Sequence, residues 1–189
     1  MREYEKKGSA VETILDWAET LVFSVFLVVV CFTFVFRIAN VVGHSMENTL
    51  FEGDRLIISH LCYYPEPGDI VVVNSETMNE TIIKRVIATS NQEVVIDYKE
   101  GTVKVDGKII DEPYIKEKMR ELGSFSGDYY NIKKDVYEYK VPFGYVFVLG
   151  DNRNGSADSR AIGCVAEEEI VGRVVFRIYS ERAELGVVK

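Results

Sequence analysis

A serine hydroxyl is a poor nucleophile until a neighbouring group takes its proton, so the bases that the chain offers decide whether its serines can react. Histidine is rare, because only His44 and His60 are present. His44 adjoins Ser45, and neighbouring side chains in an extended segment point to opposite faces, which places this imidazole badly for that hydroxyl. A Ser-His-Asp triad would therefore depend on His60, which lies in the undistinguished stretch 59–61.

Lysine can act as the base when it is neutral, and neutrality requires its pKa to fall from about 10.4 through burial among apolar groups. Lys84 has such neighbours, since it follows Ile82 and Ile83 and precedes Arg85 and Val86. On a strand, alternation would place Lys84 on the same face as Ile82 and Val86. The alternative is an exposed strand lysine, because lysines are rarely fully buried.

The elements that must position these residues are short β-branched runs, which follow residue 37 and are separated by turn residues. Glycine and aspartate at 99–101 and 106–107 tolerate the positive φ of hairpin turns. One helical excursion is expected from Tyr114 to Leu122, between a proline and a glycine. The predicted fold class is all-β, a mostly antiparallel β catalytic domain with a small helical excursion. Strands are expected at 55–59, 69–74, 81–88, 93–98, 102–105, 145–150 and 170–179.

An uncharged and almost wholly apolar stretch runs from Thr20 to Phe36, and as a helix it approaches the thickness of a bilayer. We interpret it as one N-terminal transmembrane helix, whose start is indicated by the capping-box spacing of Ser9 and Glu12. A cleavable signal would end in small residues and a core helix would show a polar face, and this run has neither feature. The predicted organisation is an N-terminal cytoplasmic segment and helix start (1–19), a transmembrane anchor (20–37) and an extracytoplasmic β-rich domain (38–189).

Basic residues indicate the orientation of this anchor. Arg2, Lys6 and Lys7 precede it, whereas only Arg37 lies close to its other end, which favours a cytoplasmic N-terminus and a large C-terminal part outside. Ser45 lies eight residues after Arg37. An extended chain covers at most about 3.5 Å per residue, so Ser45 must stay near the surface of the lipid bilayer. Its substrate should then lie near the membrane as well.

Composition excludes several classes of function. The formal net charge is −8 and the basic residues are scattered, which argues against nucleic acid as a partner. Cys31, Cys62 and Cys164 are odd in number and widely spaced, so a disulfide framework or a zinc site has no support, although a bridge between Cys62 and Cys164 stays open. No cluster of His, Cys or carboxylates implies a metal or an organic cofactor. The oligomeric state is not indicated.

Four segments with distinctive composition follow the apolar run in a fixed order. Together they resemble the successive motif boxes of bacterial type I signal peptidases. The last segment is the most specific, because it is long and mixed; without the resemblance it would be interpreted as a polar turn. The segments are SMENTL at 45–50, GDIVV at 68–72, KRVIA at 84–88 and GDNRNGSADSR at 150–160.

The resemblance implies roles for five residues. Ser45 would attack the scissile carbonyl, while neutral Lys84 would remove the hydroxyl proton and later deliver a proton to the leaving amine. Ser156 would match the family serine that hydrogen-bonds and orients the lysine. Asp158 and Arg160 would belong to the pair that holds the site in shape, and a close Asp-Arg pair is a sound way to fix a loop.

The implied substrates are secretory preproteins with signal peptides, which carry an apolar segment and small residues at the cleavage site. Val41, Met46 and Ile83 flank the catalytic pair. They are candidates to bind substrate by lining shallow apolar pockets for those small side chains. Ordinary core packing is an equally open alternative for these three residues.

The chain departs from the family pattern at two places near Ser45. Asn48 stands where the family usually has a proline, which removes a fixed φ. Gly43 stands where some members have a hydroxyl that donates to the oxyanion. The oxyanion hole would then depend on the Ser45 backbone N–H, together with a second backbone donor or water.

The expected function is that of a membrane-anchored serine endopeptidase, which removes N-terminal signal peptides from secreted preproteins after a small residue by means of a Ser/Lys dyad. It would be single-pass in the cell membrane. A self-cleaving Ser/Lys repressor is a rival, but it would need a DNA-binding segment instead of the anchor. A second rival is a catalytically silent or specialised membrane-tethered accessory, for example in pilus assembly. The presence of both Ser45 and Lys84 argues against silence.

Overall fold

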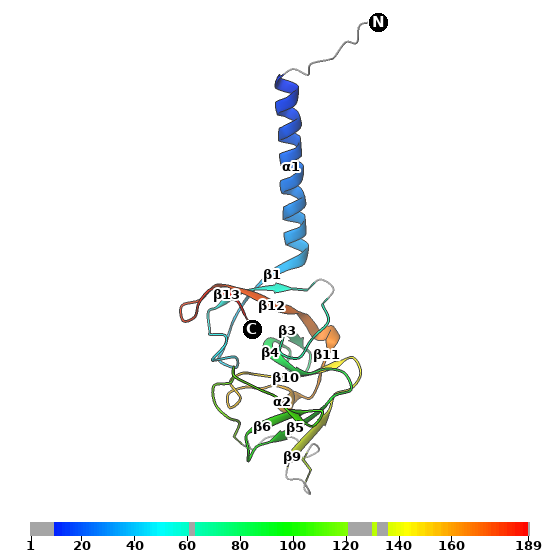
Figure 1. The fold of residues 1–189 in the computed structure, drawn as a ribbon, viewed down its shortest axis with the longest axis vertical. Coiled ribbons are helices and arrows are strands. Elements are labelled where there is room, and N and C mark those ends of the chain that lie inside the picture. The colour runs from blue at the N-terminus through cyan, green and yellow to red at the C-terminus, as the bar shows by residue number, and fades with distance from the viewer. Residues whose placement is uncertain (1–9, 61–62, 121–129, 132–135, 189) are drawn as a thin grey trace. The chain divides into compact units, whose positions relative to one another are not determined.

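The computed structural model describes residues 10–60, 63–120, 130–131 and 136–188. The chain divides into two compact units, residues 1–36 and residues 37–189. In the first unit, helix α1 runs from Ala10 to Val35 (Figure 1). The stretch Ala10–Val30 is long and apolar enough to cross a membrane, and none of it is buried. This lack of burial distinguishes α1 from the core helix of a small domain.

The rest of the described chain forms two sheets, which can be followed in Figure 1. The strand pairings from β2 onward, such as β3 with β4 and β5 with β9, are antiparallel. The expected all-β, mostly antiparallel fold class is therefore confirmed. The eight-stranded sheet has the order β1 (Phe36–Asn40), β2 (Arg55–Ser59), β12 (Ile170–Tyr179), β3 (Ile70–Ser75), β4 (Glu80–Ala88), β10 (Tyr145–Leu149) and β11 (Val165–Ala166), with β13 (Gly186–Val187) paired to β12. The five-stranded sheet has the order β7 (Lys108–Ile109), β6 (Thr102–Val105), β5 (Glu93–Asp97), β9 (Val136–Lys140) and β8 (Tyr130–Asn131).

Among the described residues, two short helices lie outside the sheets. Helix α2 spans Ser159–Ile162, and the 3₁₀ helix η2 spans Glu167–Glu169. The expected turn at Asp106 and Gly107 joins β6 to β7, and both residues have positive φ (50° and 77°). Aspartate and glycine adopt this conformation at low cost, which is why the sequence predicts this hairpin.

Strands β3 and β4 form the hairpin that carries Lys84. Their register pairs Val71 with Lys84 and Val73 with Ile82. Side chains alternate between the two faces of a strand, so Ile82, Lys84 and Val86 lie on one face, as the alternation of the sequence predicts. Ile82 and Val86 belong to a buried apolar cluster on that face. Lys84 therefore lies in apolar surroundings.

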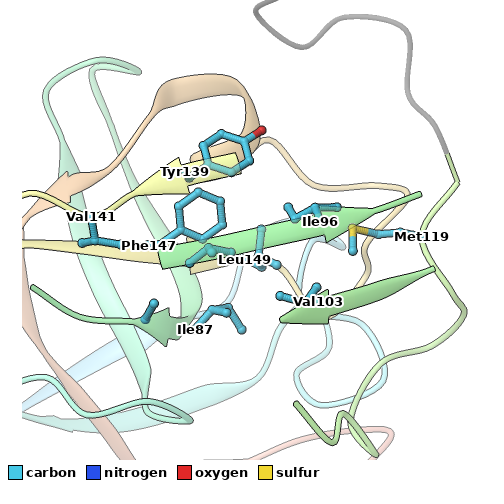
Figure 2. Packing of buried hydrophobic residues seen from close by; sticks show 10 residues of the cluster. Ile87, Ile96, Val103, Met119, Tyr139, Val141, Phe147 and Leu149 are labelled. Carbon is cyan, nitrogen blue, oxygen red and sulfur yellow. The ribbon is translucent and has the colours of Figure 1, made fainter. Parts of the chain in front are cut away.

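Two further clusters of buried side chains complete the core. One lies between the smaller sheet and strands β4 and β10, and Figure 2 shows its members from both sheets, among them Ile96, Val103, Phe147 and Leu149. The other packs β2, β3 and β12 against the segment that follows β1, from which Met46 and Leu50 contribute. This second cluster anchors the segment that carries Ser45.

The helix expected from Tyr114 to Leu122 is not observed. Residues 114–120 are irregular, and 121–122 lie outside the described residues. Two backbone N–H groups of this segment bond to another loop: Lys116 donates to the Asp151 carbonyl oxygen at 3.5 Å and Arg120 to Asn154 Oδ1 at 2.9 Å. Tertiary hydrogen bonds of this kind override a local helical preference.

Candidate active site

Ser45 lies at the start of a tight turn that follows β1. The backbone N–H groups of Thr49 and Leu50 both donate to the carbonyl oxygen of Met46, at 3.0 and 2.9 Å. Met46 and Leu50 are almost fully buried, so the turn is anchored in the core on one side. The side chain of Ser45 stays partly exposed. This arrangement holds the hydroxyl at the surface on a well-supported backbone.

Lys84 meets this hydroxyl from strand β4. Its Nζ atom donates to Ser45 Oγ at 2.9 Å and to the Ile83 carbonyl oxygen at 3.1 Å. The lysine is only 3% exposed. The two residues that the sequence nominated as nucleophile and base therefore lie within hydrogen-bond reach, although 39 positions separate them.

Burial is the main influence on the protonation of Lys84. It lowers the pKa of the amine, because a charged ammonium is poorly solvated in apolar surroundings. The negative charges of Asp158 and Glu80 act in the opposite direction and raise this pKa, while the positive charge of Arg160 lowers it. The net direction is downward, and a neutral amine hydrogen-bonded to a hydroxyl is equipped to accept its proton.

A cleft of about 430 Å³ opens beside this pair. Ser45, Lys84 and Ile83 line it, together with Gly43 and Ala157. Its wall is formed largely by β4 and by the segment after β1. The cleft is an open groove, suited to an extended peptide or a small ligand, and is not a closed cavity.

The loop from Gly150 to Arg160 packs against the backbone of Ser45. A Cβ atom added to Gly150 would lie 2.3 Å from Ser156 Oγ and 2.5 Å from the Ser45 carbonyl oxygen. Only glycine leaves room for both neighbours at this point. The Ser156 hydroxyl is buried, and it has no hydrogen-bond partner in the part of the chain that the structure describes. Its expected contact with Lys84 is thus not formed in this arrangement.

Asp158 and Arg160 form the close pair that the sequence suggested. Arg160 donates from Nε and Nη2 to the two carboxylate oxygens of Asp158, at 2.7 and 2.8 Å. Both side chains are almost completely buried. Asp158 also accepts from the Gly150 backbone N–H at 3.0 Å and caps α2. The pair therefore fixes both ends of the loop that faces Ser45.

This combination of segments matches a known family over most of the chain. A family model described as signal peptidase, peptidase S26, matches residues 14–179. The chain belongs to the signal peptidase family. Signal peptidase I T of Bacillus subtilis (strain 168) is 37% identical over 172 residues, which cover 87% of this chain and 84% of that protein. Signal peptidase IB of Staphylococcus aureus (strain COL) is 33% identical over 181 residues, with 88% and 90% covered.

A solved structure of a signal peptidase I from Enterococcus faecalis V583 aligns with a TM-score of 0.45 and 26% identity, over 59% of this chain and 97% of that chain. The family and its curated members confirm the enzyme class expected from the sequence, a serine endopeptidase of the signal peptidase I type.

In this signal peptidase, the structure adds a buried ion pair that the sequence analysis did not assign. Arg85 donates from Nε and Nη2 to the two carboxylate oxygens of Asp151, at 2.9 and 2.7 Å. Thr49, at the end of the turn that carries Ser45, donates to the same carboxylate. Asp151 follows Gly150 and Arg85 follows Lys84 in the chain. Both residues therefore lie within motif boxes, and this position is the sequence signal that could have identified them.

Asn152 is a second contributor without an assigned role. Its backbone N–H donates to the Ser45 carbonyl oxygen at 3.0 Å, and its Nδ2 donates to the His44 carbonyl oxygen at 3.1 Å. Two hydrogen bonds from one residue thus hold the two peptide groups that flank the Cα atom of Ser45. The His44 imidazole itself contacts Glu47 at 2.9 Å and not Ser45.

The three candidates for substrate binding separate into two groups. Ile83 lines the cleft. Val41 and Met46 are 5% and 2% exposed and pack in the core cluster with Leu50, and they are not among the residues that line the cleft. For these two residues the structure favours core packing, because their side chains belong to the buried cluster under the turn that carries Ser45.

Within the described residues, no group of three His, Cys, Asp or Glu side chains is arranged to hold a metal ion. Cys164 is half-buried and free, and burial raises the pKa of its thiol to about 11. Cys31 lies in α1, and Cys62 lies outside the described residues. The disulfide from Cys164 that the sequence left open is therefore not formed in this structure.

Proposed function

We propose that the chain is a membrane-anchored signal peptidase in which Ser45 and Lys84 form the catalytic dyad. It removes N-terminal signal peptides from secreted preproteins by cleaving after a small residue. The observation that carries this proposal is the 2.9 Å contact between Lys84 Nζ and Ser45 Oγ at a buried amine. The neutral amine takes the hydroxyl proton as Ser45 attacks the scissile carbonyl, and then returns it to the leaving amine.

The developing oxyanion needs a donor close to the nucleophile. The Ser45 backbone N–H donates to no residue in the described ranges, so it is available for this purpose. Gly43, two positions earlier, has no side chain with which to contribute. Preorganised donors aimed at the developing charge supply a large part of catalysis in acyl transfer. We assign the first oxyanion donor to the Ser45 N–H.

The membrane location rests on the N-terminal helix. We propose an N-terminal cytoplasmic segment (1–19), a single transmembrane anchor (20–37) and an extracytoplasmic catalytic domain (38–189). The apolar stretch in α1 and the excess of basic residues before it support this topology. The short tether from Arg37 keeps Ser45 close to the bilayer surface, where the signal peptides of preproteins lie.

Cleavage of a purified preprotein by the full chain in detergent tests the function. The expected result is one cut after a small residue, located by mass spectrometry, and its complete loss in Ser45→Ala. The Ser90→Ala variant removes a hydroxyl from another loop, where Ser90 bonds Glu167, and it serves as the matched control. Failure of the intact chain to cut several preproteins would instead favour the catalytically silent accessory.

The pH dependence of cleavage should respond to Glu80. Its negative charge raises the pKa of Lys84, so Glu80→Gln should lower this pKa and move the acidic limb of the kcat/KM profile to lower pH. Glu80 is exposed, so added salt should reduce the difference between the two proteins. Glu76→Gln removes a nearby exposed charge that does not influence Lys84, and it should leave the limb in place. A shift of the Glu80→Gln limb to higher pH would contradict the assignment of Lys84 as the base.

A further inference from the structure

The turn that carries Ser45 contains an unusual backbone conformation. Asn48 has a φ of 95°, in the region that favours glycine. Asparagine tolerates positive φ better than most residues, whereas the ring of proline fixes φ near −65°. A proline, which is usual at this position in the family, could therefore not adopt the backbone conformation of this turn. An interaction of the Asn48 side chain adds to the buried Met46 and Leu50 in holding this turn.

That interaction comes from a distant segment. Asn48 Nδ2 donates to the Tyr114 carbonyl oxygen at 3.1 Å, across 66 positions of the chain. Tyr114 belongs to residues 112–120, which we call the strap. The strap is the irregular segment that follows β7, and its residue Met119 is only 3% exposed and packs in the core cluster of the smaller sheet (Figure 2). The strap is thus anchored in the core at a point away from Ser45.

Further contacts join the strap to the loops around the nucleophile. The Arg85 guanidinium stacks over the Tyr114 ring at 3.9 Å, which is a cation–π contact. Lys116 Nζ forms an ion pair at 3.2 Å with Glu47, which lies two residues after Ser45 in the turn. At the other end, Asn154 Nδ2 donates to the Lys118 carbonyl oxygen at 3.2 Å. The strap therefore bonds to both segments that meet at Ser45.

We propose that the strap positions the nucleophile, and that Asn48 is the residue through which it acts on the Ser45 turn. This inference rests on the proposed function, because it assigns a role within the same site. Asn48 touches no reacting atom, so it is a positioning residue. Its hydrogen bond holds a turn that lacks the proline ring, and thereby keeps the Ser45 hydroxyl in line with Lys84.

The sensitivity of catalysis to position makes this role measurable. A displacement of about 1 Å in a reacting group can cost on the order of 10²-fold in rate. Loss of the Asn48 hydrogen bond alone should displace the turn less than loss of all the contacts that hold it. We therefore expect a loss in kcat of roughly tenfold when the Asn48 side chain is removed.

Asn48→Gly is the most direct test, because glycine keeps the positive φ and removes only the side chain. The expected result is a kcat about tenfold below the wild type, with KM and thermal stability unchanged. Asn91→Gly is the matched control, since Asn91 is also exposed and has a φ of 68°, and it should keep the wild-type kcat. An unchanged kcat in Asn48→Gly, or a loss explained by lower stability alone, would overturn the proposal.

A double-mutant cycle separates the strap from a local effect of Asn48. Tyr114→Leu removes the ring that stacks on Arg85 and loosens the strap. If Asn48 acts through the strap, the effects of Asn48→Gly and Tyr114→Leu on kcat will be less than additive. Additive effects would show that Asn48 acts without the strap.

Hydrogen exchange gives a readout that does not depend on activity. The amides of Thr49 and Leu50 bond within the turn, and their protection should fall in Asn48→Gly but not in Asn91→Gly. Unchanged protection would overturn the proposal even if the wild type proved inactive. A wild type that cuts no preprotein, with reduced protection in Asn48→Gly, would reject the proposed function alone.

Discussion

Replacing Lys84 with methionine is expected to lower kcat by roughly 10⁴-fold or more. Methionine fills a similar apolar space but cannot accept the proton of the Ser45 hydroxyl, so the hydroxyl stays a poor nucleophile. The measurement is kcat for cleavage of a purified preprotein by the full chain in detergent. Lys140→Met changes an exposed lysine on β9 and should keep the wild-type value. Retention of more than a small fraction of activity in Lys84→Met would require a different base.

The same variant is expected to be more stable than the wild type at neutral pH. Burial lowers the pKa of Lys84 in the native state. Between this lowered pKa and the usual value for lysine, the unfolded chain binds more protons than the native state, so the free energy of unfolding rises with pH. Below that interval the wild type carries the full cost of its buried amine. The methionine variant has no such cost, so its unfolding midpoint should be higher, by a margin that shrinks as the pH approaches about 10.4. A lower midpoint would contradict the assigned direction of the pKa.

Gly150→Ala should have the second largest effect. The added Cβ would approach the Ser45 carbonyl oxygen to 2.5 Å and Ser156 Oγ to 2.3 Å, and the backbone oxygen cannot yield without moving the nucleophile. We expect kcat to fall on the order of 10²-fold, and the free energy of unfolding to fall by about 1–3 kcal/mol through overpacking. The measurements are kcat for preprotein cleavage and denaturant unfolding of the full chain.

Gly172→Ala separates these two effects. Its Cβ would lie 2.5 Å from the Ser59 carbonyl oxygen, a clash of the same kind between β12 and β2, and Gly172 does not line the catalytic cleft. This variant should lose a similar amount of stability and keep a near wild-type kcat while folded. Equal losses of kcat in the two variants would mean that Gly150 matters for folding and not for the place of Ser45.

Local composition predicted most of the scaffold. The strands expected at 55–59, 102–105 and 170–179 have those bounds in the structure, because β-branched runs between turn residues form strands in most contexts. The apolar run from Thr20 likewise lies in one helix, α1, except for its last residue, Phe36, which begins β1. These properties depend on neighbours in the chain, so they are accessible from the sequence.

Elements that depend on distant partners were missed or misassigned. Strand β9 was not expected, because Val136–Lys140 alternates only weakly; it forms as the partner of β5, where Tyr139 pairs with Val94 in the core. Residues 114–120 were assigned to a helix because of Pro113 and Gly123, but the acceptors on the catalytic loops direct their amides elsewhere. In both cases a tertiary hydrogen-bonding partner outweighed the local pattern.

The residue types and their order are enough to predict a serine, a lysine and the polar box from Gly150 to Arg160 within the segments of a known family, all of them after an apolar helix. Residue types and their order are properties of the chain alone. The burial of Lys84, the 2.9 Å between its amine and Ser45 Oγ, and the bond from Asn48 to the strap are visible only in the folded chain. Burial and distance arise from the pairing of strands and loops far apart in the chain, and the pKa of Lys84 follows from that packing.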